Sequence, residues 1–518
     1  MSRCPTCHNP LKEEHSRPEI LEQWAGDTSC VGVPFLHHSR WWFGKSFWLT
    51  AIIIAYLISA VHVYATLIYK YFQYPSSVRV QMKSSDRLDF PAITICNLNL
   101  VKASYFEANL DAFGQDVMYY WNVLETVRHD GSNTSKEVLQ ALSVQSEDTL
   151  RKYLQYALYS EKIDLVKAGH RLEDMLVECT YQSEFCGIQN FTRIEDPNYG
   201  NCYTGLFGYF QDLRSIGGPD YGLKLILDVQ SSEYLSHVTA EKGFRVEAHP
   251  LPQFPFPLDN GFSVTPGFST SVSVHETRLT RIALPYDNTN CTPSTDITEM
   301  TLFDGYDRHL RTKLNLNSSK VRQNYSRQAC VMNCYQKDIA DLCRCFDYQI
   351  ATYGIANLAG YSHLSACGTP EVNESEASCV FEAKRSSNCA DQCQSPCEEV
   401  IFDTSATQSS WPNANYFATM INVWKYKMPS LTPLTLAEAQ QSLLKLNIYR
   451  KSQNYVRIVE SAAMDLLDLL SPREAFSVFD LDGSQERTTN WKENSWESMK
   501  QNNWQAFRMP RPHADAVR

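Results

Sequence analysis

The run FWLTAIIIAYLISAVHVYATLIY, residues 47–69, decides the fold class of this chain. It carries a single ionisable side chain, His62. A helix that crosses a bilayer needs about 20 predominantly apolar residues, and aromatic side chains flank this run as they do at membrane interfaces. The long polar segment before it and the lack of a small-residue cleavage site after it disfavour a cleaved signal sequence. We therefore predict a transmembrane helix over 47–69, with a buried core helix as the alternative.

Cysteines and glycosylation sequons indicate the orientation of this helix, since basic residues lie on both sides of it. Of the 17 cysteines, most fall between Cys96 and Cys397. All Asn-X-Ser/Thr sequons also follow the helix, at Asn133, Asn190, Asn290, Asn317, Asn324 and Asn373. Stable disulfides and N-linked glycans both require the oxidising, extracellular side of the membrane. We expect a cytosolic segment 1–46, an extracellular domain 70–471 and residence in the plasma membrane.

Charge and motifs exclude several functions. The net charge of −11 argues against a nucleic-acid partner, which requires a basic face. The sequence contains no G-x-S-x-G, Walker or H-E-x-x-H motif. We therefore expect neither an enzyme nor a cofactor or metal site.

Hydrophobic patterning beyond the helix mixes strands and helices. Alternating or β-branched runs predict strands, and apolar positions at helical spacing predict helices. The predicted strands are 86–100, 221–230, 243–248, 269–285 and 441–457, and the predicted helical segments are 135–178 and 321–342. This order indicates a mixed domain whose two ends return to the membrane side.

The spacing of the later cysteines suggests a nested disulfide ladder. Cys330 and Cys334 lie one helical turn apart, and Cys389 and Cys393 repeat the step of four. The two pairs would then join across the fold. A zinc cluster is the alternative, although few histidines lie nearby. Spacing alone leaves the connectivity open.

Several runs resemble the epithelial sodium channel/degenerin family, and they occur in the family's order. They are YFQYPSSVRV (71–80), FPAITICNLN (90–99), GHRLEDMLVECTYQSEFCG (169–187), GNCYT (200–204), GFRVEAH (243–249), YSRQACVMNCYQKDIADLCRC (325–345), CQSPCEEVIF (393–402) and LLKLNIYRKSQNY (443–455). The resemblance implies an α+β membrane protein. Its extracellular part would be a disulfide-rich "clenched hand", with a β-sheet palm and a helical finger and thumb, on one N-terminal transmembrane helix.

The resemblance also implies site residues. The implied disulfides are Cys96–Cys202, Cys179–Cys186, Cys291–Cys397, Cys330–Cys393, Cys334–Cys389, Cys343–Cys379 and Cys345–Cys367. Tyr71 and Tyr286 match the aromatic positions that couple the thumb to the first membrane helix. Gly32 matches the end of a cytosolic Thr-x-x-His-Gly gating run, but Val31 stands where the family has histidine.

The sequence departs from the family after Ser471. The family continues into a second transmembrane helix that lines the pore, whereas residues 472–518 are polar and contain no long apolar run. We therefore expect a chain that does not conduct by itself, because a conducting path needs a polar lining.

The function predicted from these features is a subunit of a trimeric, sodium-selective, amiloride-sensitive channel. The trimer would contain copies of this chain or other family subunits, and sodium ions would cross a complete pore. Protons or a peptide are candidate extracellular ligands. A non-conducting regulatory subunit or ligand-binding receptor form is the alternative. The order of the motifs disfavours a third possibility, an adhesion or enzyme ectodomain.

Overall fold

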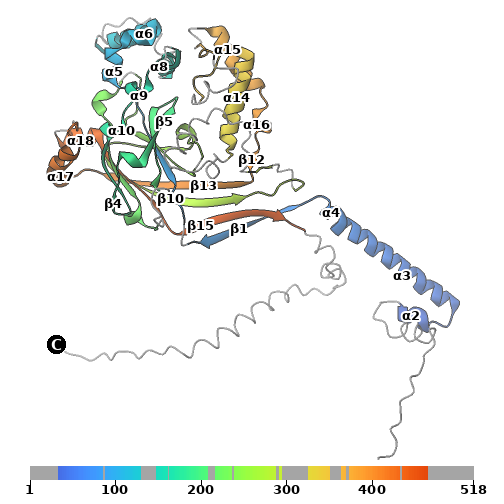
Figure 1. Ribbon diagram of the computed structural model, residues 1–518. Helices are drawn as coiled ribbons and strands as arrows, with labels where there is room; N and C mark the ends of the chain where they lie inside the picture. The colour runs from blue at the N-terminus through green and yellow to red at the C-terminus, as the bar shows by residue number, and fades with distance from the viewer. Residues whose placement is uncertain are drawn as a thin grey trace, which may run out of the picture. The chain divides into compact units, whose positions relative to one another are not determined.

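The computed structural model describes residues 33–85, 88–129, 148–160, 163–207, 216–235, 238–251, 253–286, 291–293, 325–350, 363–368, 373–431 and 435–464 (Figure 1). The chain divides into two units. One contains the residues up to Pro75 and those from Ala463 onward, and the other spans Ser76–Ala462. Each unit is described by itself.

The first unit contains the apolar helix. After the short helix α2 (Val33–His38), helix α3 (Trp42–Val63) runs into a π-helical turn, η1 (Tyr64–Ile68), and then α4 (Tyr69–Tyr71). The helix thus begins earlier than predicted, at Trp42 rather than at residue 47. Among the described residues, α3 is the one helix that is long and apolar enough to cross a membrane, and none of its side chains is buried in the protein.

An eight-stranded sheet is the frame of the large unit. Its strands, in spatial order, are β1 (Ser76–Ser84), β15 (Asn454–Ala462), β10 (Phe268–Thr280), β14 (Leu443–Arg450), β7 (Leu223–Asp228), β3 (Leu176–Tyr181) and β4 (Glu184–Phe185), with β13 (Glu398–Ser410) paired to β10. The first and last of these strands in the sequence are neighbours: β1 and β15 pair antiparallel, with Ser76 opposite Ala462.

A five-stranded sheet packs against this frame. Its order is β5 (Phe191–Asp196), β6 (Gly200–Gly205), β2 (Ala92–Asn97), β8 (Phe244–His249) and β9 (Phe262–Val264). One hydrophobic core contains Ile93 and Ile95 of β2 together with Leu225 and Leu227 of β7, all almost fully buried. Buried β-branched and leucine side chains on facing strands therefore hold the two sheets together.

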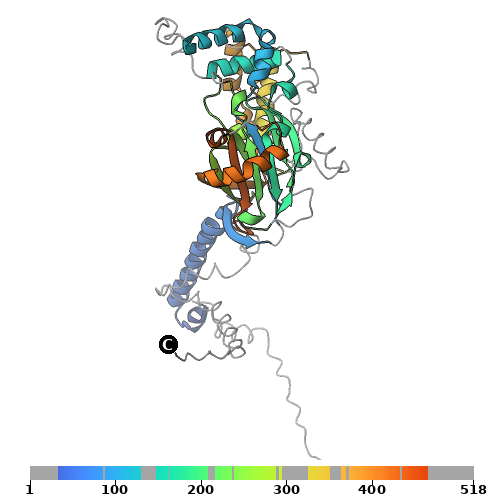
Figure 2. The ribbon, with the colours of Figure 1, turned by 90° about the vertical axis from the view of Figure 1, so that its left-hand side faces the viewer.

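Helices occupy three positions around the sheets. Helices α5 (Ala103–Ala108), α6 (Gly114–His129) and α8 (Asp148–Ser160) share a core of their own. Figures 1 and 2 show them at the end of the unit opposite to β1 and β15. Helices α17 (Ala414–Lys427) and α18 (Leu436–Ser442) pack on the large sheet around the fully buried Trp424. Helices α14 (Arg327–Cys343), α15 (Glu374–Ser386) and α16 (Cys389–Gln392) form the third group.

Three predicted elements are corrected by the structure. The predicted strand 441–457 is two strands, β14 and β15, interrupted at residues 451–453; both run parallel to successive parts of β10. The predicted helical segment 135–178 ends in strand β3, after the short helices α9 (Leu165–Ala168) and α10 (Leu172–Met175), and its first part lies outside the described residues. The predicted strand 269–285 ends at Thr280, where the backbone N–H of Arg281 turns to the carbonyl of Cys397.

Candidate functional site: the disulfide-stapled helices and their junction with the sheets

Helices α14 and α15 begin at the side-chain caps that their sequences provide. The Ser326 hydroxyl accepts a hydrogen bond from the Ala329 N–H, and the Asn373 side chain accepts one from the Glu376 N–H. Such caps satisfy backbone donors that would otherwise lack partners. The three helices lie side by side in Figure 1.

Five disulfides join these helices and the segments around them. Cys330–Cys393 and Cys334–Cys389 tie one face of α14 to α16 and to the residue after it. The other three are Cys291–Cys397, Cys343–Cys379 and Cys345–Cys367. The structure thus joins the pairs that the resemblance implies. It joins Cys96 to Cys202 and Cys179 to Cys186 as well.

One group of residues near this ladder has the composition of a metal site. The side-chain ligand atoms of Cys334, Asp338 and Cys389 lie within 4.8 Å of one another. The two sulfurs are bonded to each other, however, and a metal requires free thiolates. The group is therefore part of the ladder.

The segment that leads from α16 to β13 fixes the stapled helices to the large sheet. Arg281, just after β10, donates to the carbonyl of Pro396 at 2.6 Å and pairs with Glu399 at 2.8 Å. The Cys291–Cys397 disulfide and the short strands β11 (Cys291–Thr292) and β12 (Ser395–Pro396) lie at the same place. The stapled helices are thus tied covalently and by an ion pair to the start of β13 and the end of β10.

A second junction joins α14 to the five-stranded sheet. Asn260, at the end of the short helix α12 (Pro257–Asn260), donates to Gln328 Oε1 at 3.2 Å and to Glu247 Oε1 at 3.4 Å. The Gln328 amide in turn donates to the carboxylate of Asp259. A chain of polar contacts therefore runs from strand β8 to the first turn of α14.

A cavity of about 910 Å³ opens at this junction. Strand β8, the start of α14 and strands β10, β13 and β15 all line it. Glu247 and His249 project from alternate positions of β8 toward it, and each is 3% exposed. Glu247 Oε2 has no hydrogen bond of good geometry among the described residues. The backbone N–H of Phe256 nevertheless lies near enough to favour the charged form of this carboxyl.

Burial controls the protonation of these groups. It is the largest cause that raises the pKa of Glu247, and the nearby carboxylates of Asp196 and Asp259 add to the rise. The Asn260 and Phe256 contacts oppose it, and the resulting pKa is about 8. Burial raises the pKa of Asp196 to about 6 and lowers that of His249 to about 4. Desolvation disfavours the charged form in each case. Glu247 is therefore largely protonated at neutral pH, and His249 is neutral.

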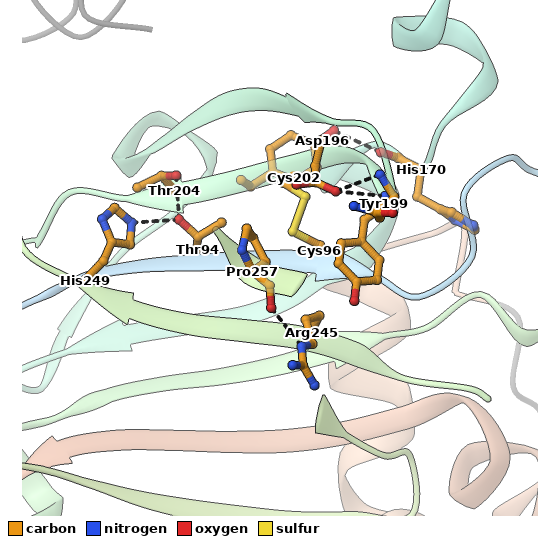
Figure 3. Close-up of a disulfide and its surroundings, with 12 residues drawn as sticks. Thr94, Cys96, His170, Asp196, Tyr199, Cys202, Thr204, Arg245, His249 and Pro257 are labelled. Carbon is orange, nitrogen blue, oxygen red and sulfur yellow. Dashed lines mark hydrogen bonds between the residues drawn. A yellow bond between two sulfur atoms is a disulfide. The ribbon is translucent and has the colours of Figure 1, made fainter. Parts of the chain in front are cut away.

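Figure 3 shows how the Cys96–Cys202 disulfide organises the neighbouring polar groups. The disulfide joins residues directly opposite each other on β2 and β6. On one side of it, the Thr94 hydroxyl lies 2.9 Å from His249 Nε2 and 2.7 Å from the Thr204 hydroxyl. On the other side, the Asp196 carboxylate accepts the backbone N–H of Tyr199 at 3.1 Å. The Thr94 hydroxyl is thus held by cross-strand contacts, and the Asp196 carboxylate is held by the backbone of the turn that follows β5.

An ion pair lies inside the large sheet beside the junction. Arg450 of β14 and Glu276 of β10 are 1% and 3% exposed, and their charged atoms are 2.7 Å apart. Glu276 also binds Arg278 at 2.5 Å, and Arg278 lies over the ring of Tyr455 on β15. Because β15 pairs with β1, this charged group lies between the helix junction and the strand that follows the apolar helix.

The other predicted site residues are distributed as follows. Tyr71 belongs to the first unit, in α4, and Tyr286 to the second, so their predicted contact stays a prediction. Asn190 ends the 3-10 helix η3 (Ile188–Asn190) and Asn373 precedes α15, and both are half-buried. Gly32, Asn133, Asn290, Asn317 and Asn324 lie outside the described residues.

Sequence patterning missed Glu247 and His249 as site residues. In GFRVEAH, the charged and polar side chains alternate with apolar ones, which is typical of a strand with one solvent-exposed face. Only the packing of the second sheet and of α14 places this polar face in the interior. The available signal was two titratable side chains, Glu247 and His249, at alternate positions of one strand.

Comparison with known proteins identifies the family. A family model described as amiloride-sensitive sodium channel matches residues 24–472. The chain belongs to the amiloride-sensitive sodium channel family. This is a family of ion channels and not of enzymes. The epithelial sodium channel subunit beta-2 of Xenopus laevis is 31% identical over 318 residues, which are 60% of this chain and 45% of the relative. The subunit alpha of Neoceratodus forsteri is 22% identical over 487 residues, covering 79% of this chain and 68% of the relative. The chain thus spans about half of the beta-type relatives and about two thirds of the alpha-type.

Proposed function

We propose that this chain is a subunit of a trimeric, sodium-selective and amiloride-sensitive cation channel of the plasma membrane. Residues 1–46 would be cytosolic, the segment 47–69 would span the membrane, and residues 70–471 would form an extracellular domain that gates the channel. The match to the channel family over residues 24–472 supports the proposal most directly. The apolar helix α3 and the disulfides of the large unit fit this topology.

The contacts of the large unit suggest a route for gating. Displacement of α14 would act on β10 and β13 through Arg281 and the Cys291–Cys397 disulfide. Strand β10 pairs with β15, and β15 pairs with β1 along its whole length. Strand β1 follows Pro75 directly, so a shift of this strand pulls on the chain that leads to the apolar helix. A continuous hydrogen-bonded route of this kind transmits small movements because packed sheets deform little.

We propose further that the 518-residue chain acts together with other family subunits. The polar composition of residues 472–518 supports this view, because these residues offer no apolar run for a pore helix. A non-conducting regulatory subunit is the second candidate, and the same feature favours it. In either case, protons or a peptide acting on the outer domain are the candidate stimuli.

Co-purification tests the assembly. An affinity-tagged chain is expressed with full-length epithelial sodium channel subunits, and the complex is isolated from membranes and its mass measured. We expect the relative to co-purify in a complex with the mass of three subunits. A single-pass glycoprotein of another family is the control. Recovery of this chain only as a monomer, with no relative attached, would contradict the proposal.

A further inference from the structure

A second cavity, of about 470 Å³, lies away from the stapled helices and shares no lining residue with the junction cavity. Segments of α9, α10, β5 and β6 and the residue before α5 surround it. Its charged lining consists of four basic side chains and one acidic: Lys102, Lys167, Arg171, Arg193 and Glu173. Two of the four basic groups are paired with carboxylates outside the lining, Lys167 with Asp164 at 3.2 Å and Arg193 with Glu195 at 2.7 Å.

Two of these cations are available to a ligand. The hydrogen bonds of Lys102 within the described part of the chain involve its backbone, with Ala168 and Phe106. Arg171 contacts Glu173 at 3.6 Å, and both side chains are about half exposed. An exposed ion pair of this kind contributes little to stability, so a ligand oxyanion can replace Glu173 as the partner of Arg171.

Arg193 is held in place from behind. Its guanidinium donates to Asn201 Oδ1 at 2.7 Å and to Glu195 Oε1 at 2.7 Å. Asn201 is itself fixed by the carbonyl of His170, at 3.2 Å. A guanidinium that is preorganised in this way offers its planar donors to an oxyanion with little loss of entropy.

The floor of the cavity is aromatic. Tyr203 is 7% exposed and donates its hydroxyl to the carbonyl of His170 at 2.9 Å. Arg193 and Arg171 line the same cavity as this phenol, and their charges oppose the rise in its pKa. Burial raises the pKa of Tyr203 to about 12, so the ring stays neutral. The positive groups therefore surround an uncharged, partly apolar surface.

Apolar side chains complete the lining. Phe191 and Leu172 are buried beneath the cavity, whereas Val166 and Ile188 are 47% and 42% exposed at its edge. The volume is that of a small-molecule site, and such sites combine an apolar surface with a few charged groups that orient the ligand. A ligand matched to this lining carries a strong oxyanion and an apolar body.

We propose that this cavity binds a small organic phosphate or sulfate ester. The oxyanion lies between Lys102, Arg171 and Arg193, and the apolar group of the ester packs on Tyr203 and Ile188. Three cations favour a tetrahedral oxyanion over a single carboxylate, because more of its oxygens accept charge-assisted hydrogen bonds. This binding is independent of ion conduction and of subunit assembly.

Calorimetry on the full 518-residue chain in detergent micelles tests the proposal. The probes are phenyl phosphate and phenyl sulfate, which distinguish the two ester classes, with inorganic phosphate as the comparison. We expect saturable binding of at least one ester that weakens at high salt. Lys102→Gln and Arg171→Gln should each weaken it by about tenfold, the effect of losing one well-placed charge contact.

Arg385→Gln is the matched control, since Arg385 forms a similar exposed pair with Glu382 at 3.8 Å on α15. Binding should be unchanged in this variant, and all three variants should melt at the temperature of the parent. Absence of saturable binding, or equal binding in all variants, overturns the proposal. Inorganic phosphate that binds as tightly as phenyl phosphate overturns the assignment of an apolar subsite.

Discussion

Ser76 lies opposite Ala462 at one end of the antiparallel pair β1 and β15, so the two ends of the large unit are hydrogen-bonded neighbours. A closed frame of this kind has one consequence for function. In the proposed gating, movement of the stapled helices would reach the strand after Pro75 through paired strands and not through a loop. The buried Glu276–Arg450 pair lies along that route, and Glu247 lines the cavity beside it.

Glu247→Gln should stabilise the protein in a pH-dependent way. The folded carboxyl has a pKa of about 8 and the ordinary value is 4.5, so the folded state holds this proton more tightly. Stability contributed by Glu247 therefore falls as the pH rises from about 4.5 to about 8. The variant should melt with the parent at pH 4.5 and at least about 2 °C above it at pH 8.5.

Glu398→Gln is the control for this experiment, because Glu398 lines the same cavity but is exposed. Melting is followed by intrinsic fluorescence between pH 4.5 and 9. A gap between Glu247→Gln and the parent that stays constant across this range would show that titration of Glu247 is not its cause.

Glu276→Gln should be strongly destabilising. The substitution leaves the Arg450 guanidinium, 1% exposed, without its ionic partner. Removing one member of a buried pair costs about 3–5 kcal/mol, whereas replacing both members by apolar residues is often tolerated. Denaturant unfolding should therefore show a smaller loss for Glu276→Leu combined with Arg450→Met than for Glu276→Gln.

The exposed pair of Arg385 and Glu382 is the reference for that measurement. Arg385→Gln should change the free energy of unfolding by less than about 1 kcal/mol. A double variant as unstable as the single one would mean that packing, and not the unpaired charge, is responsible.

The two nested disulfides should contribute to stability in a non-additive way. Cys330–Cys393 closes a separation of 63 residues, and Cys334–Cys389 closes one of 55 inside it. With the first bridge intact, the second restricts only a short additional loop of the unfolded chain, and the entropic gain grows with the loop that is closed. Replacing both cysteines of one bridge by serine should therefore lower the free energy of unfolding clearly less than replacing all four cysteines.

Denaturant midpoints under non-reducing conditions compare these variants. The four-cysteine variant should lose more unfolding free energy than the two single-bridge variants lose together, because either bridge alone holds the same segments together. Strictly additive losses would argue that each bridge acts through its own local packing.

Two sequons within the described residues test the topology. Asn190 and Asn373 both lie in the large unit, and the Asn373 side chain caps α15 through its oxygen, leaving the amide nitrogen for a glycan. Asn190→Gln and Asn373→Gln should each remove one glycan, seen as one step in gel mobility before endoglycosidase treatment. Identical mobility of parent and variants with and without the enzyme would place the large unit on the cytosolic side.

Sequence reasoning located some parts of the fold better than others. The alternation of YGLKLILDVQ gave strand β7 because one face of that strand enters the core, with Leu223, Leu225 and Leu227 fully buried. The pattern of residues 441–457 predicted one strand, whereas the structure has two, β14 and β15. Nothing local distinguishes residues 451–453 from the strands around them, and only the pairing of both strands with β10 requires the break.

The site, too, contains features that the sequence could predict and others that it could not. The cysteine pairs could be named because a family resemblance adds connectivity to spacing. The burial of Glu247, by contrast, depends on contact between a strand and helix α14, which lies far from it in the sequence. Local patterning treats an alternating charged residue as exposed, and it is correct only when no second layer covers that face.

The most direct test of the central claim, that this chain acts as a channel subunit, is the amiloride-sensitive sodium current of oocytes. The chain is expressed alone, and then with full-length epithelial sodium channel subunits at increasing ratios. The account predicts no current from the chain alone and a graded change of the amiloride-sensitive current on co-expression. A current that is unaffected at every ratio, with both proteins present at the surface, would contradict it.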